Sequence, residues 1–188
     1  MSWTITPEKM ADAPLIEALI DLCFGPGRFA KTAYRLREGV QPVAALSLTA
    51  WEDGTLRGSL RFWPIAIAGV RGLILGPLAV QPDQRGRGIG IDLMQQGILK
   101  AQAMGVPFII LVGDEPYYGK VGFKRLPQGQ IEMPGPVNPA RLLGLELVAG
   151  ALAAAQGLVL RVVPDEPVAA AGAPLSQRSA ALDPPGPK

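Results

Sequence analysis

The chain has 188 residues, of which 48% are apolar, and a formal net charge of +2. This length predicts one domain with a substantial core, and the small charge argues against nucleic acid as the main partner. No run reaches the roughly 18 apolar residues of a membrane helix, and the N-terminal residues do not resemble a secretory signal. We therefore expect a cytoplasmic protein without membrane contact.

Histidine is absent, and there is a single cysteine, Cys23. One cysteine excludes an internal disulfide, and its apolar surroundings predict a packing role. The lack of histidine excludes Ser-His and Cys-His nucleophile pairs, an imidazole general base and most catalytic zinc sites. The chemistry must therefore use carboxylates, tyrosine, lysine, backbone amides or a bound cosubstrate, and we expect no metal site.

The first part of the chain predicts two helices followed by strands. Apolar residues at helical spacing predict a helix over Pro14 to Phe24, ended by a Gly-Pro-Gly sequence, and a second over Arg28 to Glu38. The pattern then changes to β-rich runs over Val43 to Trp51 and Leu56 to Ile67. An Asp-Gly pair between them predicts a hairpin.

A third strand, Arg71 to Val80, contains a Gly76-Pro77 break. Because proline cannot donate to a ladder, this break predicts a bulge or a departure from the neighbouring strand. A glycine-rich turn follows, then a helix ending near Met104 and a short apolar strand, Phe108 to Val112. This order predicts a parallel β-α-β crossover.

The last part of the chain predicts a helical turn over Tyr117 to Val121 and closing strands over Leu142 to Val148 and Gly157 to Val163. Residues 164–188 are rich in proline and alanine and have no persistent period. We therefore predict a domain over residues 1–163 and a disordered tail.

The glycine-rich turn carries the clearest functional signal. Alternate glycines between a strand and a helix leave backbone N–H groups uncovered, and the helix start adds unpaired donors and a partial positive charge. These features predict a diphosphate site, with Arg85 and Arg87 adding charge at its rim. A Walker loop is excluded because Gly-Lys-Ser/Thr is missing, and the dinucleotide fingerprint fails at Ile91 in one register and at Leu93 in the other.

The pattern Arg85-x-x-Gly88-x-Gly90 resembles motif A of the GNAT N-acetyltransferase superfamily, whose loop and helix start bind the pyrophosphate of coenzyme A. The broken strand is similar to the family's fourth strand, which splays from the fifth and pairs with pantetheine. The resemblance covers residues 1–163, most specifically 74–123, and the closing strands suit a subgroup of bacterial predicted acetyltransferases. It implies contacts with acetyl-CoA from Leu78, Ala79, Val80, Arg85, Gly86, Arg87, Gly88, Ile89 and Gly90.

The same resemblance implies an α/β fold of the GNAT (acyl-CoA N-acyltransferase) type. Its mixed central sheet is splayed between two parallel strands and flanked by helices. The segment from Tyr117 to Phe123 is similar to the family's motif B, in which Tyr118 would protonate the departing coenzyme A thiolate. A phenol suits this step because it can donate a proton without being charged at neutral pH. We interpret Tyr117 as a packing aromatic.

The general base stays open. An amine acceptor must lose a proton, yet Arg71 to Val80, where many relatives carry a glutamate, contains no carboxylate. Asp114, Glu115 and Glu146 are candidates by placement, although each can equally be structural, and Asp114 can cap the helical turn that follows it.

A basic helix face is also ambiguous. Arg28, Lys31 and Arg35 form either a solvated face or, by the resemblance, a rim that draws an anionic acceptor. Trp51 and Trp63 are expected in the core or in a cleft wall.

The function predicted from the sequence is acetyl transfer from acetyl-CoA to an amine, directly within a ternary complex and without a metal. The acceptor would be a small-molecule amine or a protein amine, and a homodimer is compatible with the family. The alternative is a non-catalytic acyl-CoA-binding or regulatory module, motivated by the missing base.

Overall fold

In the computed structural model, residues 2–162 are described, and the predicted tail lies outside them. The strands are β1 (Thr4–Pro7), β2 (Leu48–Glu52), β3 (Thr55–Ile67), β4 (Val70–Val80), β5 (Phe108–Val112), β6 (Lys124–Arg125), β7 (Ile131–Glu132), β8 (Leu142–Glu146) and β9 (Gly157–Arg161). They form one mixed sheet in the order β1-β2-β3-β4-β5-β8-β6, to which β9 adds by pairing with β3 and β7.

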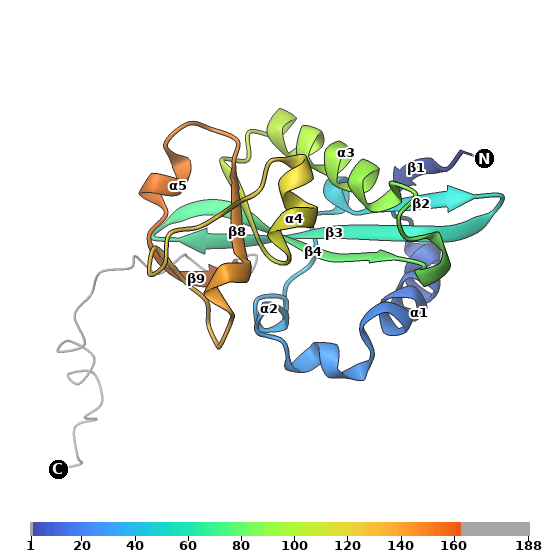
Figure 1. The fold of residues 1–188 in the computed structure, drawn as a ribbon, viewed down its shortest axis with the longest axis horizontal. Coiled ribbons are helices and arrows are strands. Elements are labelled where there is room, and N and C mark those ends of the chain that lie inside the picture. Colours follow the sequence, from blue (N-terminus) through green and yellow to red (C-terminus); the bar gives the residue numbers. More distant parts are fainter. Residues whose placement is uncertain (1, 163–188) are drawn as a thin grey trace, which may run out of the picture.

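Helices cover both faces of this sheet (Figure 1). The helices are α1 (Ala13–Phe24), α2 (Thr32–Arg35), α3 (Ile89–Ala103), α4 (Glu115–Tyr118) and α5 (Ala151–Ala154). The α3 helix packs on β2 and β3, and α1 packs on the opposite face of β3 and β4. Of the helices in the described part of the chain, none has the length and apolarity needed to cross a membrane.

The predicted crossover is confirmed, since β4 and β5 are parallel and α3 connects them. Small residues let α3 approach the sheet closely. A Cβ atom on Gly97 would lie 2.6 Å from the ring of Phe62, which is fully buried. The main core lies in this layer and includes Leu60, Leu93 and Ile109.

The predicted break in β4 is confirmed as a β-bulge. Gly76 and Pro77 together stand opposite one residue of β3, Arg61, because the register shifts between Leu60 and Phe62. On its other side β4 pairs with β5 only at Leu73↔Ile109 and Ile74↔Ile110. Beyond those two pairs the parallel strands separate, as the resemblance implied.

Three sequence expectations need correction. Residues 28–38 do not form one helix but a 3-10 segment (Pro26–Ala30) and the short α2, separated by extended backbone at Lys31. Tertiary bonding supports this break, because the Thr32 hydroxyl donates to Pro136 O at 2.7 Å. Residues 44–46 form a 3-10 turn, so β2 begins only at Leu48.

The third correction is β1, which the sequence pattern missed because it is only four residues long. Its stability comes from antiparallel pairing with β2 rather than from its own composition. The two-residue strands β6 and β7 were missed for the same reason.

Candidate functional site

The glycine-rich turn joins the separated end of β4 to α3. Gly86 and Gly88 adopt φ values of 82° and 104°, in the left-handed region that favours glycine. Gly88 is the N-cap of α3. Within residues 2–162, no backbone carbonyl accepts a hydrogen bond from the amides of residues 86–90. The turn therefore presents a run of unpaired N–H groups at a helix N-terminus, an arrangement that binds oxyanions.

A pocket of about 900 Å³ runs from this turn along the separated part of β4. Seven of the nine residues predicted to contact acetyl-CoA line it, as does Tyr118: Leu78, Val80, Arg85, Gly86, Gly88, Ile89 and Gly90. The remaining two, Ala79 and Arg87, do not. The structure therefore brings together the β4 edge, the loop and Tyr118.

Ala79 alternates with its neighbours along the strand and points to the other face of the sheet. Its side chain is buried with Ile16, Leu19 and Ile20 of α1. Ala79 therefore does not line the pocket, whereas its neighbours Leu78 and Val80 do. On the same edge the Cys23 thiol, which is half-buried rather than buried, donates to Val80 O at 3.3 Å and lines the pocket.

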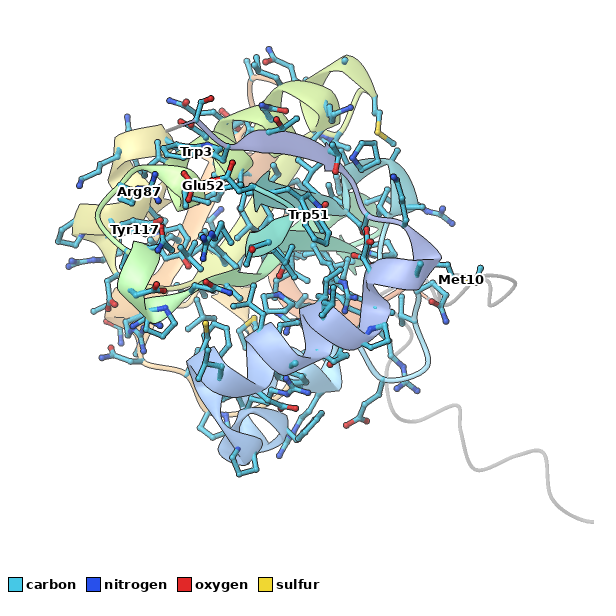
Figure 2. The ribbon with its side chains drawn as sticks, turned by 90° about the vertical axis from the view of Figure 1, so that its right-hand side faces the viewer. Trp3, Met10, Trp51, Glu52, Arg87 and Tyr117 are labelled. Atoms are coloured by element: carbon cyan, nitrogen blue, oxygen red, sulfur yellow. The ribbon has the colours of Figure 1, made fainter. Side chains whose placement is uncertain are left out.

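The Arg87 side chain takes a different place from the one expected. Its guanidinium makes two hydrogen bonds with Glu52, at 2.7 and 3.0 Å, and lies over the Trp3 ring (Figure 2). Glu52 is 4% exposed, and hydrogen bonding from Arg87 holds its pKa below the ordinary value, against the effect of burial. Arg87 therefore fastens the loop to β2 instead of lying at the pocket rim.

Tyr118 is held from several sides at the end of α4. Its ring packs edge-on against Tyr117 and Phe123, with centroids 5.2 and 6.2 Å away. It also lies over Gly113, where an added Cβ would approach the ring to 2.1 Å. Burial raises the pKa of Tyr118 to about 12, with Tyr117 and Asp114 adding to the effect. The phenol therefore keeps its proton at neutral pH.

Tyr117 also lines the pocket, although the sequence suggested only packing. A Cβ on Gly90 would lie 2.2 Å from its hydroxyl oxygen. The hydroxyl thus lies against the first turn of α3, and only glycine at position 90 leaves room for it. This contact joins α4 to the loop.

The three candidate bases occupy different environments. Asp114 lines the pocket and forms an ion pair with Arg141 at 3.1 Å, and its side chain makes no capping bond to α4. Glu115 forms an ion pair with Arg125 at 2.6 Å, and Glu146 accepts from the Leu152 amide. Only Asp114 is placed where it can reach a substrate.

The basic face suggested by the sequence is not a face of one helix. Arg28 is buried and paired with Glu17 and Asp21, and Arg35 donates to Pro134 O at 2.8 Å. Lys31 is exposed and lies over the Phe24 ring.

Arg37, which the sequence reasoning missed, lines the pocket beside Gly76. No local signal marked it, because two of its neighbours, Trp63 and Gly76, come from β3 and β4.

Comparisons with known proteins agree with this geometry. A family model described as "Acetyltransferase (GNAT) domain" matches residues 44–125. The chain is 31% identical to the uncharacterized N-acetyltransferase YhbS of Escherichia coli K12 over 123 residues, which cover 64% of this chain and 72% of that protein. It is also 31% identical to the uncharacterized N-acetyltransferase YjhQ of the same strain, covering 61% and 65% of the two chains.

Two solved structures share the fold. The crystal structure of the GNAT family N-acetyltransferase YhbS from Escherichia coli, in complex with CoA, matches with a TM-score of 0.73 at 27% identity, covering 85% of this chain and 89% of that one. A GNAT family acetyltransferase from Brucella melitensis, in complex with acetyl-CoA, matches with a TM-score of 0.56 at 29% identity over 77% and 96%. The chain therefore belongs to the GNAT family of N-acetyltransferases.

Proposed function

We propose that the protein transfers an acetyl group from acetyl-CoA to an amine, directly and within a ternary complex. The observation that carries this proposal is that one pocket combines an unpaired β4 edge, a loop of free amides and the Tyr118 hydroxyl. The acceptor is a small-molecule amine or a protein amine. The relatives solved with CoA and acetyl-CoA support the choice of donor.

In this proposal the diphosphate of acetyl-CoA binds the amides of residues 86–90, with Arg85 adding charge at the rim. Arg87 acts indirectly, by holding the loop through Glu52. The amides of pantetheine pair with the main chain of β4 at Leu78 and Val80, as an added strand would. The N–H and C=O groups of Ala79 point toward β3 instead, because the Gln81 N–H donates to Arg57 O and the antiparallel ladder alternates from that pair. This arrangement directs the thioester toward the bulge and Tyr118.

The reaction then needs positioning and proton transfer. The amine nitrogen attacks the thioester carbonyl carbon, a C–N bond forms, and the C–S bond breaks as the thiolate departs. Tyr118 donates its phenolic proton to the departing sulfur. The nitrogen loses one proton, either to Asp114 or through water to solvent, and the Tyr118 phenolate regains a proton from solvent. The transfer is balanced in atoms and electrons without a metal or a redox partner, because the thioester is already activated.

Replacing Tyr118 with phenylalanine tests the acid role. We expect kcat for acetyl transfer to fall by about 100-fold, while KM for acetyl-CoA changes little because the ring and its packing remain. The matched control is Tyr117→Phe, which removes an adjacent hydroxyl and should leave kcat close to that of the wild type. Free thiol release, measured with a panel of amines, gives both constants.

Equal kcat values for Tyr118→Phe and the wild type would remove Tyr118 from the mechanism. A different outcome would favour the alternative function. If CoA raises the melting temperature but no amine in the panel is acetylated, the protein is a non-catalytic acyl-CoA-binding module. The Asp114–Arg141 ion pair is compatible with that alternative, because it leaves no unpaired carboxylate lining the pocket in the described chain.

A further inference from the structure

A second, smaller cavity of about 280 Å³ lies on the other side of the β4 bulge. Its walls come from α1, from α2 and the segments before and after it, and from β3 and β4. Four residues line both cavities and form the boundary between them: Arg28, Tyr34, Arg37 and Pro77. The two spaces therefore meet at the bulge, where the proposed thioester position lies.

Three arginines line the smaller cavity, and two of them are neutralised. Arg28 forms ion pairs with Glu17 and Asp21 at 3.1 and 3.0 Å. Arg61 forms ion pairs with Glu8 and Glu17 at 2.7 and 2.9 Å. These carboxylates neutralise the positive charges of Arg28 and Arg61.

Arg37 differs from these two arginines because, in the described part of the chain, no carboxylate forms an ion pair with it. Its Nε atom is buried and has no hydrogen-bond partner there. The residue as a whole is half-buried, and a charge taken partly out of water without a partner is unfavourable in a folded protein. Such a group indicates that an anion from outside the described chain completes the site.

The guanidinium of Arg37 is held in a fixed position. It lies 4.7 Å from the ring centroid of Tyr34 and 5.8 Å from that of Trp63. Trp63 is itself fixed, since its indole N–H donates to Gly76 O at 2.7 Å. A Cβ on Gly76 would lie 3.1 Å from the Arg37 guanidinium, so the cation lies directly against the bulge.

The pKa values reflect this difference between the arginines. Burial lowers the pKa of Arg37 to about 10, so the group is still charged at neutral pH but at a cost. Burial acts on Arg61 in the same direction, but hydrogen bonds with Glu8 and Glu17 outweigh it and hold the pKa above its ordinary value. An anion beside Arg37 would offset the unfavourable free energy of burying its charge, as Glu8 and Glu17 do for Arg61.

We propose that Arg37 binds an oxyanion of the acceptor, so that the acceptor is a small amine that also carries a carboxylate or a phosphate. This inference rests on the proposed function. A planar guanidinium that lies over two aromatic rings suits bidentate recognition of such a group. The aromatic side chains of Tyr34, Phe29 and Trp63 supply apolar walls for the rest of the molecule.

The diphosphate of the donor does not account for this cation. Gly76 lies four residues before the end of β4 at Val80, and a strand rises about 3.3 Å per residue. The Arg37 guanidinium is therefore on the order of 13 Å along the strand from the start of the loop, and on the side of the second cavity. Its anion belongs to the other substrate.

The experiment compares matched amines with and without an anionic group. The pairs are O-phosphoethanolamine with ethanolamine, phenylalanine with phenethylamine, and lysine with cadaverine. We expect the wild type to prefer the anionic member of at least one pair by about 30-fold or more in kcat/KM, chiefly through KM. A 30-fold preference corresponds to about 2 kcal/mol, the lower end of what a buried charge pair loses when one partner is removed.

Arg37→Gln should abolish this preference by lowering kcat/KM for the anionic amine alone, and Arg37→Lys should restore part of it. Arg71→Gln, which removes an exposed arginine of β4, is the control for net charge and should keep the preference. The phosphate pair and the carboxylate pairs distinguish the two kinds of oxyanion. A preference that survives in Arg37→Gln, or a wild-type preference for the amines without an anionic group, overturns the inference.

A binding measurement separates this inference from the proposed function. Each anionic amine is titrated calorimetrically into the CoA complex of the wild type and of Arg37→Gln. If no amine is acetylated, the proposed function fails, but binding to the wild type that is lost in Arg37→Gln still supports the anion site. Equal binding to both proteins, or no binding to the wild type, overturns it. CoA-induced thermal stabilisation confirms that the variant is folded.

Discussion

Replacing Arg37 with methionine is expected to stabilise the free protein, although it would remove a binding group. The lowering of the Arg37 pKa to about 10 corresponds to about 3 kcal/mol of unfavourable free energy. Because the folded-state pKa is below the unfolded-state pKa, this penalty is present in full at neutral pH and disappears only as pH rises above about 10. Methionine has a similar shape and carries no charge.

The variant also loses two cation–π contacts, with Tyr34 and Trp63. Each of these contributes on the order of 1 kcal/mol in a partly desolvated site. The expected result is therefore a net increase of about 1 kcal/mol in the free energy of unfolding, measured by urea denaturation without ligand. The increase should shrink when an anionic acceptor is present at saturation, because only the wild type gains from binding it.

Arg61→Met is the matched control. Arg61 is buried but has two carboxylate partners, so its removal leaves Glu8 without a cation, and leaves Glu17 with Arg28 alone. We expect the free energy of unfolding to fall by about 2 kcal/mol or more. If Arg37→Met destabilised the protein as much as Arg61→Met does, Arg37 would be a structural residue and the reasoning from its missing partner would be refuted.

Two further predictions concern the loop and the helix behind it. Glu52→Gln should weaken CoA binding, because the neutral amide no longer forms an ion pair with the Arg87 guanidinium and the loop loses its attachment to β2. A Kd for CoA, measured by calorimetry, that equals the wild-type value would contradict this prediction. Gly97→Ala should lower the free energy of unfolding by about 1 to 3 kcal/mol despite a better helix propensity, since its Cβ would meet the buried Phe62 ring at 2.6 Å. A higher free energy of unfolding for Gly97→Ala in urea denaturation would contradict this prediction, because it would show that α3 can shift to make room. Adding Phe62→Leu to Gly97→Ala should recover part of the lost stability.

The features that the sequence predicted well are those whose determinants are close together in the chain. The turn from Arg85 to Gly90 needs only its own glycines, a strand before it and a helix after it, and the structure has all three. The bulge at Gly76-Pro77 follows from proline's missing donor. In each case the physical cause lies within a few residues of its effect.

The features that the sequence missed depend on distant partners. Arg87 appeared to be a rim charge, but its partner Glu52 is 35 residues away in the chain. The segment from Arg28 to Glu38 has helical spacing, yet a bond from Thr32 to the backbone 104 residues later accompanies its break. No periodicity encodes such contacts, since tertiary bonding overrides local propensity.

Arg37 shows why the acceptor is harder to predict than the donor. In the described part of the chain, no carboxylate forms an ion pair with Arg37. This can be recognised only once the ion pairs of the neighbouring arginines are known from the structure. In the proposed arrangement the donor is held mainly by backbone groups, which a short motif can specify. The proposed acceptor cavity is lined by side chains from α1, β3 and the segment around α2, so a relative could change its acceptor without changing the loop. In the proposed arrangement the two cationic regions lie at the two ends of the part of β4 that separates from β5, with Arg37 beside Gly76 and Arg85 beyond Val80. This separation would let one site bind two anionic substrates while keeping their like charges apart.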